Sequence, residues 1–237
     1  SIIGYHLDNL MKKYHVKFVI STGNQYLAKY CGNLDDIFND TDARIAEPAD
    51  SILGITVGSI AGVDGINMLS KQNEAVAYTR VGPGFAGHYK PDITAYGANI
   101  KKDLSIDPQD PFSKVIMPDG KIGYEAGTSF SAPVVAGDLA EIYNTHQEYD
   151  IILSQAILFN GVDPIRDSKT MSKDEAIQIS SIYGRGLSDP NNCKYSSSHK
   201  VTFLRSGYLM RKNKEHVRFL MPKIQAQTKG KATTKIT

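Results

Sequence analysis

Cysteine is scarce in this sequence, which contains only Cys31 and Cys193 among its 237 residues. The two positions are too far apart to form the closely spaced ligand pairs of a metal site, and two cysteines do not make a disulfide framework. We therefore expect free thiols. Apolar runs are also short, because none approaches the roughly 20 residues that a membrane-spanning helix needs. The sequence predicts no membrane partner.

A leader segment is also missing from the sequence, which opens on Ser1 without an initiating methionine or a signal peptide. This absence favours an intracellular location. Charge of one sign is not in excess, because 27 Lys and Arg residues are balanced by 25 Asp and Glu residues. The net charge of +2 therefore points to no nucleic-acid partner. An apolar content of 41% is typical of a globular protein, and the length suits one domain or one domain with part of another.

The segment 127–137, GTSFSAPVVAG, has the composition of a nucleophile on a turn. Gly127 allows a tight backbone approach, and the small residues around Ser129 leave its oxygen accessible. Pro133 lacks a backbone N–H, so it fits the first turn of a helix but not its interior. Apolar residues recur at helical spacing and predict a helix with one face in the core: Val134, Val135, Leu139, Ile142 and Tyr143.

Ser129 is then expected at or just before the N-terminus of that helix. The partial positive charge at a helix N-terminus favours an alkoxide and an oxyanion. A Gly-Thr-Ser triplet before a helix is, by itself, more often an ordinary N-cap. These three residues alone therefore do not establish a nucleophile.

A second set of residues of interest follows the first predicted strand. Residues 2–14 have the periodicity of an amphipathic helix, and the apolar run 16–20 has the length and β-branched content of a buried strand. A helix that leads into such a strand indicates a parallel α/β sheet, whose sites lie at the carboxyl ends of its strands. Asn24 would lie there. An Asn after a Gly is, by itself, more often a turn residue.

The segment 127–137 resembles the active-site serine motif of the subtilisin-like serine proteases (subtilases, peptidase S8), and every defined position matches. The nucleophile elbow of α/β-hydrolases would need Gly at position 131, where this chain has Ser131. Residues 18–24 resemble the subtilase strand whose terminal Asn donates a hydrogen bond to the oxyanion. The resemblance implies that Ser129 is the nucleophile and that Asn24 and the Ser129 backbone N–H hold the oxyanion. It further implies a substrate cleft lined by Ser21, Thr22, Gly23, Gly127 and Thr128.

The remaining segments follow the subtilase order. We expect a polar surface loop at 25–50, strands at 52–60 and 75–78, and a Lys-Pro-Asp segment at 90–92 that leads into another strand. An inserted loop is predicted at 99–121 and a helix at 151–159. The Gly-rich stretch 183–186 resembles a loop that closes the catalytic domain.

The base that a serine nucleophile needs is not evident in this sequence. In subtilases the catalytic Asp and His precede the oxyanion Asn, and only 23 residues precede Asn24 here. Those residues contain neither the Asp-Ser/Thr-Gly nor the His-Gly-Thr segment of the family. Asp8 and Asp92 are not expected to be triad acids, since Asp92 belongs to the Lys-Pro-Asp turn. None of the six histidines lies in the family motif: His6, His15, His88, His146, His199 and His216.

We therefore interpret the chain as part of a subtilase with an α/β, three-layer fold and a mostly parallel sheet. Residues 1–190 are expected to form the later part of the catalytic domain. Residues 195–222 are predicted to begin a β-rich extension, with strands at 201–204 and 216–220. Residues 223–237 are predicted to be a disordered tail, for which a solvated end is a simpler interpretation than a nucleic-acid contact.

The predicted activity is that of a serine endopeptidase acting on proteins or peptides, whose triad Asp and His would lie upstream of Ser1. The isolated chain is then expected to be inactive. The alternatives are a catalytically inactive, subtilase-like binding module and an esterase or acyltransferase on the same scaffold. No cofactor is predicted; calcium is common in the family, but the sequence contains no identifiable ligand cluster. The oligomeric state is left open.

Overall fold

The computed structural model describes residues 1–145, 150–165, 171–194, 202–205, 207 and 214, which form an α/β structure around a parallel sheet. The sheet contains β1 (Val19–Ser21), β2 (Ile55–Ala61) and β3 (Ile93–Gly97), in the order β1-β2-β3. Both pairings are parallel, with Val19 opposite Ile55 and Val57 opposite Ile93. The prediction of an α/β fold with a parallel sheet is confirmed.

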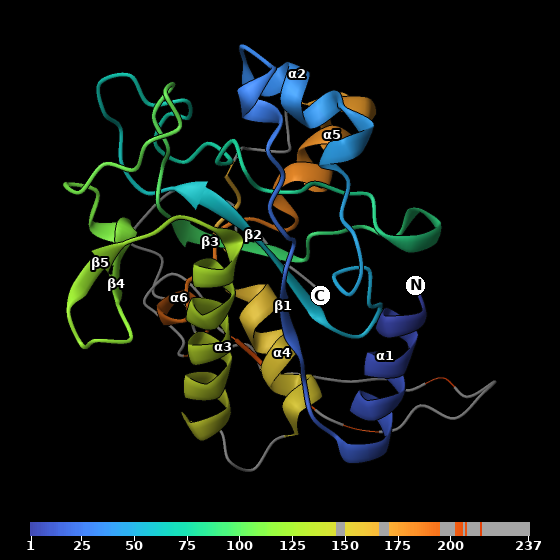
Figure 1. Ribbon diagram of the computed structural model, residues 1–237. Helices are drawn as coiled ribbons and strands as arrows, with labels where there is room; N and C mark the ends of the chain where they lie inside the picture. Colours follow the sequence, from blue (N-terminus) through green and yellow to red (C-terminus); the bar gives the residue numbers. More distant parts are fainter. Residues whose placement is uncertain (146–149, 166–170, 195–201, 206, 208–213, 215–237) are drawn as a thin grey trace, which may run out of the picture.

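The two faces of β2 lead into separate apolar clusters, as alternation along a strand requires. Ile55 and Val57 pack with β3 and with the buried residues of α3 (Thr128–Thr145) and α4 (Ile151–Asn160). Ile60 packs in a second cluster with residues from α2 (Leu34–Asn39) and α5 (Lys173–Tyr183). Figure 1 shows α3 and α4 on one side of the sheet and α2 and α5 on the other. The core therefore lies in two layers with the sheet between them.

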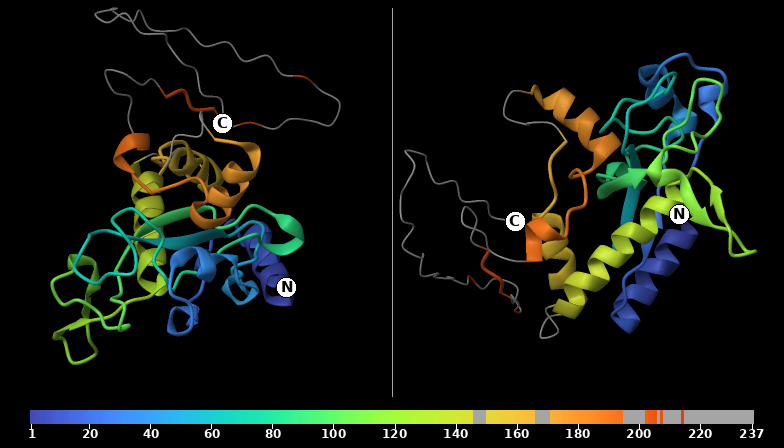
Figure 2. Two further views of the ribbon diagram at one scale, coloured as in Figure 1. Left: turned by 90° about the horizontal axis from the view of Figure 1, so that it is seen from above. Right: turned by 90° about the vertical axis from the view of Figure 1, so that its left-hand side faces the viewer.

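Helix α1 (Ile2–Tyr14) precedes the sheet and matches the predicted helix at 2–14. Ser1 caps it through a hydrogen bond from Gly4 N, and Lys12 and Lys13 stand in its last turn, where cations are favourable. Figures 1 and 2 show α1 on the same side of the sheet as α3.

The serine helix differs from its prediction in two ways. It starts at Thr128, so Pro133 is inside the helix rather than in its first turn. A residue at this position would normally donate its N–H to the carbonyl of Ser129, and proline cannot do so. The apolar face is also narrower than predicted, since Val135, Leu139 and Ile142 are buried while Val134 and Tyr143 are half exposed.

Two predicted irregular regions contain regular structure. The 25–50 loop holds α2 and two short 3-10 turns, η1 (Leu27–Lys29) and η2 (Thr41–Ala43). The 99–121 loop holds η4 (Pro111–Ser113) and the first strand of a hairpin, β4 (Lys114–Ile116), which pairs with β5 (Ile122–Tyr124). The predicted strand at 75–78 is not a strand; Ala75 forms an isolated bridge with Ile60. A further short turn, η3 (Phe85–Gly87), precedes β3.

Two helices after α4 were not predicted, α5 and the four-residue α6 (Asn191–Lys194). Helix α5 begins with a capping box in which Ser172 and Glu175 bond reciprocally to each other's backbone N–H. After α5, the Gly-rich stretch packs on β3: Gly186 O accepts from Thr94 N at 2.8 Å, and Arg185 N donates to Asp92 O at 3.0 Å.

The predicted C-terminal extension is only partly described. Residues 202–205 are not in a strand, so the strand predicted at 201–204 is absent over the residues that can be described. The second predicted strand, at 216–220, and the tail at 223–237 lie outside the described residues.

Candidate active site

The turn after β1 is held by a neighbouring backbone segment. Ser21 ends β1, and Thr22 N donates to Val57 O at 2.9 Å. Asn24 then pairs in an antiparallel bridge with Thr79. Gly23 lies between them with φ +89°, a conformation that favours glycine. The structure thus places the predicted cleft residues 21–23 at the carboxyl end of the sheet.

Thr22 is fully buried, with its hydroxyl 3.1 Å from that of Thr79. The side chain of Thr22 therefore faces the protein interior and not the surface.

Asn24 contacts the serine turn although 104 residues separate it from Thr128. Asn24 Oδ1 accepts two hydrogen bonds from Thr128, one from the backbone N–H and one from the side-chain hydroxyl, each at 3.0 Å. These two bonds fix the plane of the amide. The Nδ2 group lies over Gly127, where an added Cβ atom would be 3.1 Å from it. The amide nitrogen is thereby oriented while the amide oxygen is occupied.

Ser129 is the second residue of α3, and its side chain is exposed. Gly127 and Thr128 before it are buried, and Phe130 N donates to Gly127 O at 3.0 Å. The first N–H groups of a helix have no acceptor within the helix, so the Ser129 N–H lies where a ligand can meet it. Thr128 donates its hydroxyl to Asn24, a contact that an ordinary N-cap does not require.

A buried hydroxyl network anchors the start of α3 to the sheet. Ser131 Oγ donates to Ser59 Oγ at 2.9 Å, and Ser59 Oγ lies 3.3 Å from the Tyr78 hydroxyl, which donates to Ala98 O at 2.8 Å. A Cβ on Gly97 would lie 2.1 Å from Ser59 Oγ, so this crossing needs glycine. Burial raises the pKa of Tyr78 well above its ordinary value and keeps the phenol neutral.

This network was not predicted from the sequence. A signal was present in the sequence, because Ser59 lies in a mostly apolar strand segment and a buried hydroxyl needs a hydrogen-bond partner.

No base contacts Ser129 in the described part of the chain. His6 belongs to α1, His15 follows it, and His88 follows η3; no hydrogen bond joins any of them to Ser129. The other three histidines, at 146, 199 and 216, lie outside the described residues. The described residues also contain no group of three or more His, Cys, Asp or Glu side chains placed to hold a metal ion.

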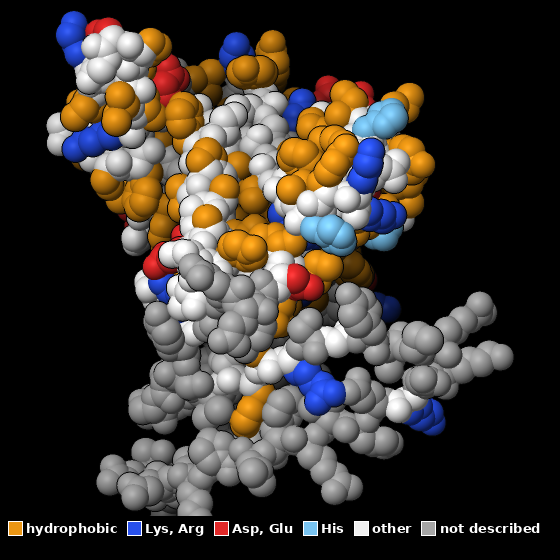
Figure 3. Space-filling view, turned by 90° about the horizontal axis from the view of Figure 1, so that it is seen from below, with side chains coloured by type: hydrophobic (Ala, Val, Ile, Leu, Met, Phe, Trp, Pro, Cys, Tyr) orange, Lys and Arg blue, Asp and Glu red, His pale blue; other side chains and the backbone are white. Residues whose placement is uncertain are grey.

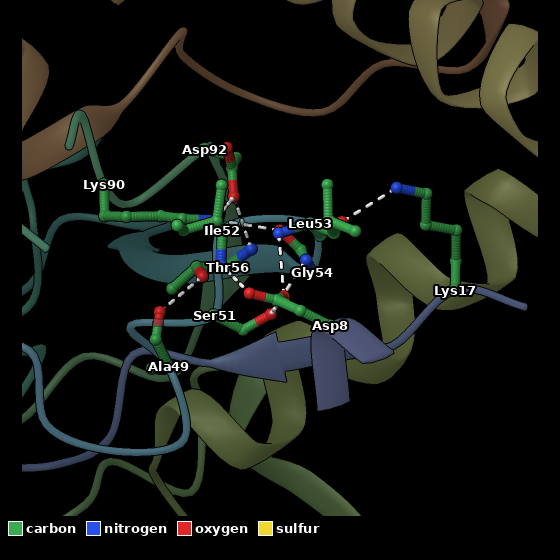
Figure 4. Close-up of polar contacts among 10 residues, drawn as sticks. All are labelled: Asp8, Lys17, Ala49, Ser51, Ile52, Leu53, Gly54, Thr56, Lys90 and Asp92. Atoms are coloured by element: carbon green, nitrogen blue, oxygen red, sulfur yellow. Dashed lines mark hydrogen bonds and ion pairs between the residues drawn. The ribbon is translucent and has the colours of Figure 1, made fainter. Parts of the chain in front are cut away.

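Asp8 and Asp92 lie at the opposite end of the sheet (Figure 4). Asp8 is buried and accepts from Ser51 Oγ at 2.6 Å, Leu53 N at 3.0 Å and Ile52 N at 3.2 Å. Asp92 Oδ2 accepts from Thr56 N at 2.7 Å and pairs with Lys90, whose Nζ also donates to Gly54 O at 2.8 Å. Asp8 therefore binds the loop before β2 and Asp92 binds backbone at the start of β2 itself, both away from the serine.

Lys17 also contacts the loop before β2. Its Nζ donates to Leu53 O at 2.8 Å (Figure 4), and burial lowers the pKa of its amine.

The helices of the described residues include none that is long and apolar enough to cross a membrane. The two cysteines were predicted to be free thiols. Cys31 is free and half-buried, and the side chain of Cys193 is not among those described.

The sequence matches a known protein family and is similar to two known proteins. The sequence profile of the Subtilase family (peptidase S8) matches residues 5–184. The chain is 26% identical over 223 residues to the uncharacterized protein y4bN of Sinorhizobium fredii (strain NBRC 101917 / NGR234), covering 83% of this chain and 52% of that protein. It is 29% identical over 153 residues to the serine protease AprX of Bacillus subtilis (strain 168), covering 62% of this chain and 31% of AprX. The chain thus spans about half the length of the first relative and less than a third of the second.

Solved structures share the fold. A lanthipeptide protease superposes with a TM-score of 0.51 and 23% identity, over 78% of this chain and 53% of its own. The epidermin leader peptide processing serine protease EpiP from Staphylococcus aureus gives a TM-score of 0.50 and 20% identity, over 79% of this chain and 42% of its own. At these identities the likeness establishes a common fold and nothing finer.

Proposed function

Because this chain belongs to the subtilase family, we propose that it is the part of a serine endopeptidase that carries the nucleophile, Ser129, and the oxyanion donor, Asn24. The observation that carries the proposal is the pair of hydrogen bonds from Thr128 to Asn24 Oδ1. These bonds orient an amide N–H donor beside the turn that presents an exposed serine hydroxyl. A residue that served only as a turn would not need this orientation.

In the proposed reaction, Ser129 Oγ attacks the carbonyl carbon of a peptide bond and loses its proton to a base. The carbonyl oxygen becomes an oxyanion, which the Asn24 Nδ2 group and the Ser129 backbone N–H stabilise. Collapse of the tetrahedral intermediate breaks the C–N bond, and the base gives the proton to the leaving amine. Water then hydrolyses the acyl-enzyme through the same steps. Residues 21–23, together with Gly127 and Thr128, would border the bound peptide.

The base and its orienting acid are proposed to come from a segment outside this chain. Two surface features support this. Among the described residues β1 pairs on one side only, and α3 exposes Phe130 and Val134 beside the serine. Hydrophobic side chains gather over the helices on this side of the molecule (Figure 3). A further strand beside β1, with helices over α1 and α3, would cover these groups.

AprX, EpiP and the lanthipeptide protease are all named as proteases, which supports a protein or peptide substrate for this chain. An inactive binding module is the second candidate, favoured by the lack of any contact between Ser129 and a base within the described residues. An esterase or acyltransferase would share the nucleophile and differ in its substrates.

Labelling with a fluorophosphonate, read by intact mass, tests the proposal. We would compare the 237-residue chain with the longest product of its gene, each as wild type and as Ser129→Ala. Labelling of the longer product that requires Ser129, with none of the isolated chain, is the expected result. Labelling of the isolated chain would contradict an external base. If neither wild-type protein is labelled, the peptidase proposal fails and the binding module is favoured.

A further inference from the structure

Arg80 joins the turn that carries Asn24 to a separate loop. Its Nε donates to the backbone carbonyl of Asn24 at 3.0 Å. Its Nη1 donates to two other carbonyls, those of Asp42 at 2.7 Å and Arg44 at 2.8 Å. One planar guanidinium therefore links the turn after β1 to the η2 turn.

The stem of Arg80 also packs on the turn. A Cβ on Gly23 would lie 3.1 Å from Arg80 Cδ, and Gly23 O accepts from Arg80 N at 3.1 Å. Gly23 has a positive φ that few other residues adopt, so the chain reverses here under the arginine side chain. The turn is thus held through its main chain at residues 23 and 24.

The acceptors of the Arg80 guanidinium given above are all main-chain carbonyls. No carboxylate forms an ion pair with Arg80 among the residues that can be described. A hydrogen bond from a cation to a neutral carbonyl is stronger than one between two neutral groups. The hydrogen bond from Arg80 therefore restrains the backbone carbonyl of Asn24 strongly. No acidic side chain among the described residues competes for the guanidinium charge.

We infer that Arg80 is a positioning residue for the oxyanion donor, an inference that rests on the function proposed above. Thr128 fixes the amide end of Asn24 through Oδ1, and Arg80 fixes the backbone end through the carbonyl. With both ends held, the Nδ2 group cannot swing with the Gly23 turn. This matters because an oxyanion donor acts over about 2.7–3.1 Å, and a misplacement of about 1 Å can cost roughly a hundredfold in rate.

Arg44 provides a matched control. Its guanidinium also donates to backbone carbonyls, Gly82 O at 2.8 Å and Asn39 O at 3.4 Å, and neither belongs to the Asn24 turn. Arg44→Gln therefore removes a comparable arginine from the same loop while keeping the carbonyl that Arg80 binds.

The first experiment uses the 237-residue chain, labelled with ¹⁵N, and follows the side-chain amide signals of Asn24 by NMR. We expect Arg80→Gln to shift or broaden these signals and Arg44→Gln to leave them in place. Arg80→Lys should restore them in part, since an ammonium can still donate to one carbonyl. Unchanged Asn24 signals in Arg80→Gln, or equal changes in Arg44→Gln, would overturn the inference.

The second experiment measures peptide hydrolysis by the longer gene product. Arg80→Gln is expected to lower kcat about tenfold while KM changes by less than about threefold, because the defect lies in transition-state stabilisation. An effect confined to KM, or matched by Arg44→Gln, would contradict a positioning role. If the wild-type protein is not labelled at Ser129, the proposed function fails, and the NMR comparison still decides whether Arg80 positions Asn24.

Discussion

The two ends of the sheet use polar residues in opposite ways. At the amino ends of β2 and β3, Asp8 accepts three hydrogen bonds, and Lys90 and Asp92 pair with each other and with backbone groups. At the carboxyl end, the side-chain amide of Asn24 accepts two hydrogen bonds at Oδ1, and the Ser129 hydroxyl is exposed.

The comparison separates structural carboxylates from reactive groups. A carboxylate whose oxygens all serve buried donors has no capacity left for a substrate, and removing it strands those donors. A side chain that is oriented but still has a donor to give can bind a charge that forms during a reaction. We therefore expect substitutions at the amino ends to change stability and substitutions at the carboxyl end to change chemistry.

The largest effect is expected for Asn24→Asp, assayed in the longer gene product. Aspartate keeps an oxygen for Thr128 but replaces the amide donor with a second acceptor. Loss of one oxyanion donor costs about 2.7–4 kcal/mol in subtilisin itself, so kcat should fall by a factor of about 100 or more. Thermal unfolding would show whether the fold is retained. Near-normal kcat would refute the proposed role of Asn24.

Asp8→Ala should give the largest loss of stability. Three donors on the loop before β2, two of them backbone N–H groups, lose a buried acceptor, and we expect a loss of about 3 kcal/mol in the free energy of unfolding. Urea denaturation of the isolated chain measures it. Asp174→Ala, on the exposed first turn of α5, is the control and should cost less than about 0.5 kcal/mol. Similar losses of stability in the two variants would contradict a structural role for the carboxylate at the amino end of β2.

Tyr78→Phe tests the network behind the serine turn. Loss of its buried hydroxyl should cost about 1–2 kcal/mol near neutral pH. Burial raises the pKa of Tyr78 in the folded state, while the unfolded chain ionises near its ordinary value of 10.0. The stabilising contribution is thus complete below that pH and declines as pH rises above it. Unfolding of both proteins from pH 7 to 11 should show the difference in stability narrowing. A constant difference would contradict a raised pKa of Tyr78 in the folded state.

The smallest effect is expected for Val134→Ser in the isolated chain. Val134 is 51% exposed, whereas its neighbour Val135 is fully buried. Val134→Ser should therefore lower the free energy of unfolding by less than about 0.5 kcal/mol, and Val135→Ser should lower it by about 2 kcal/mol or more. In the longer gene product, Val134→Ser should become more costly if a further segment covers this face. Equal costs of Val134→Ser in both proteins would indicate that the face stays open.

Local pattern was sufficient for several elements. The periodicity of residues 2–14 predicted α1, and the β-branched run before Ser21 predicted a strand that is shorter and later than expected. Segment 127–137 indicated the serine turn because its residue types are adjacent in the chain. The unpredicted α5 also had a local signal, the Ser172 and Glu175 capping box.

What the sequence by itself determined was the set of local elements, the serine turn and the family resemblance, because all three are carried by residues close together in the chain. Tertiary structure alone decided which distant groups meet. Asn24 reaches Thr128 across 104 residues, and Arg80 reaches back 56 residues to Asn24. The tertiary structure also determined that Val134 is exposed and that Pro133 lies within α3. Such contacts depend on how the whole chain packs, and short-range periodicity in the sequence cannot predict that packing.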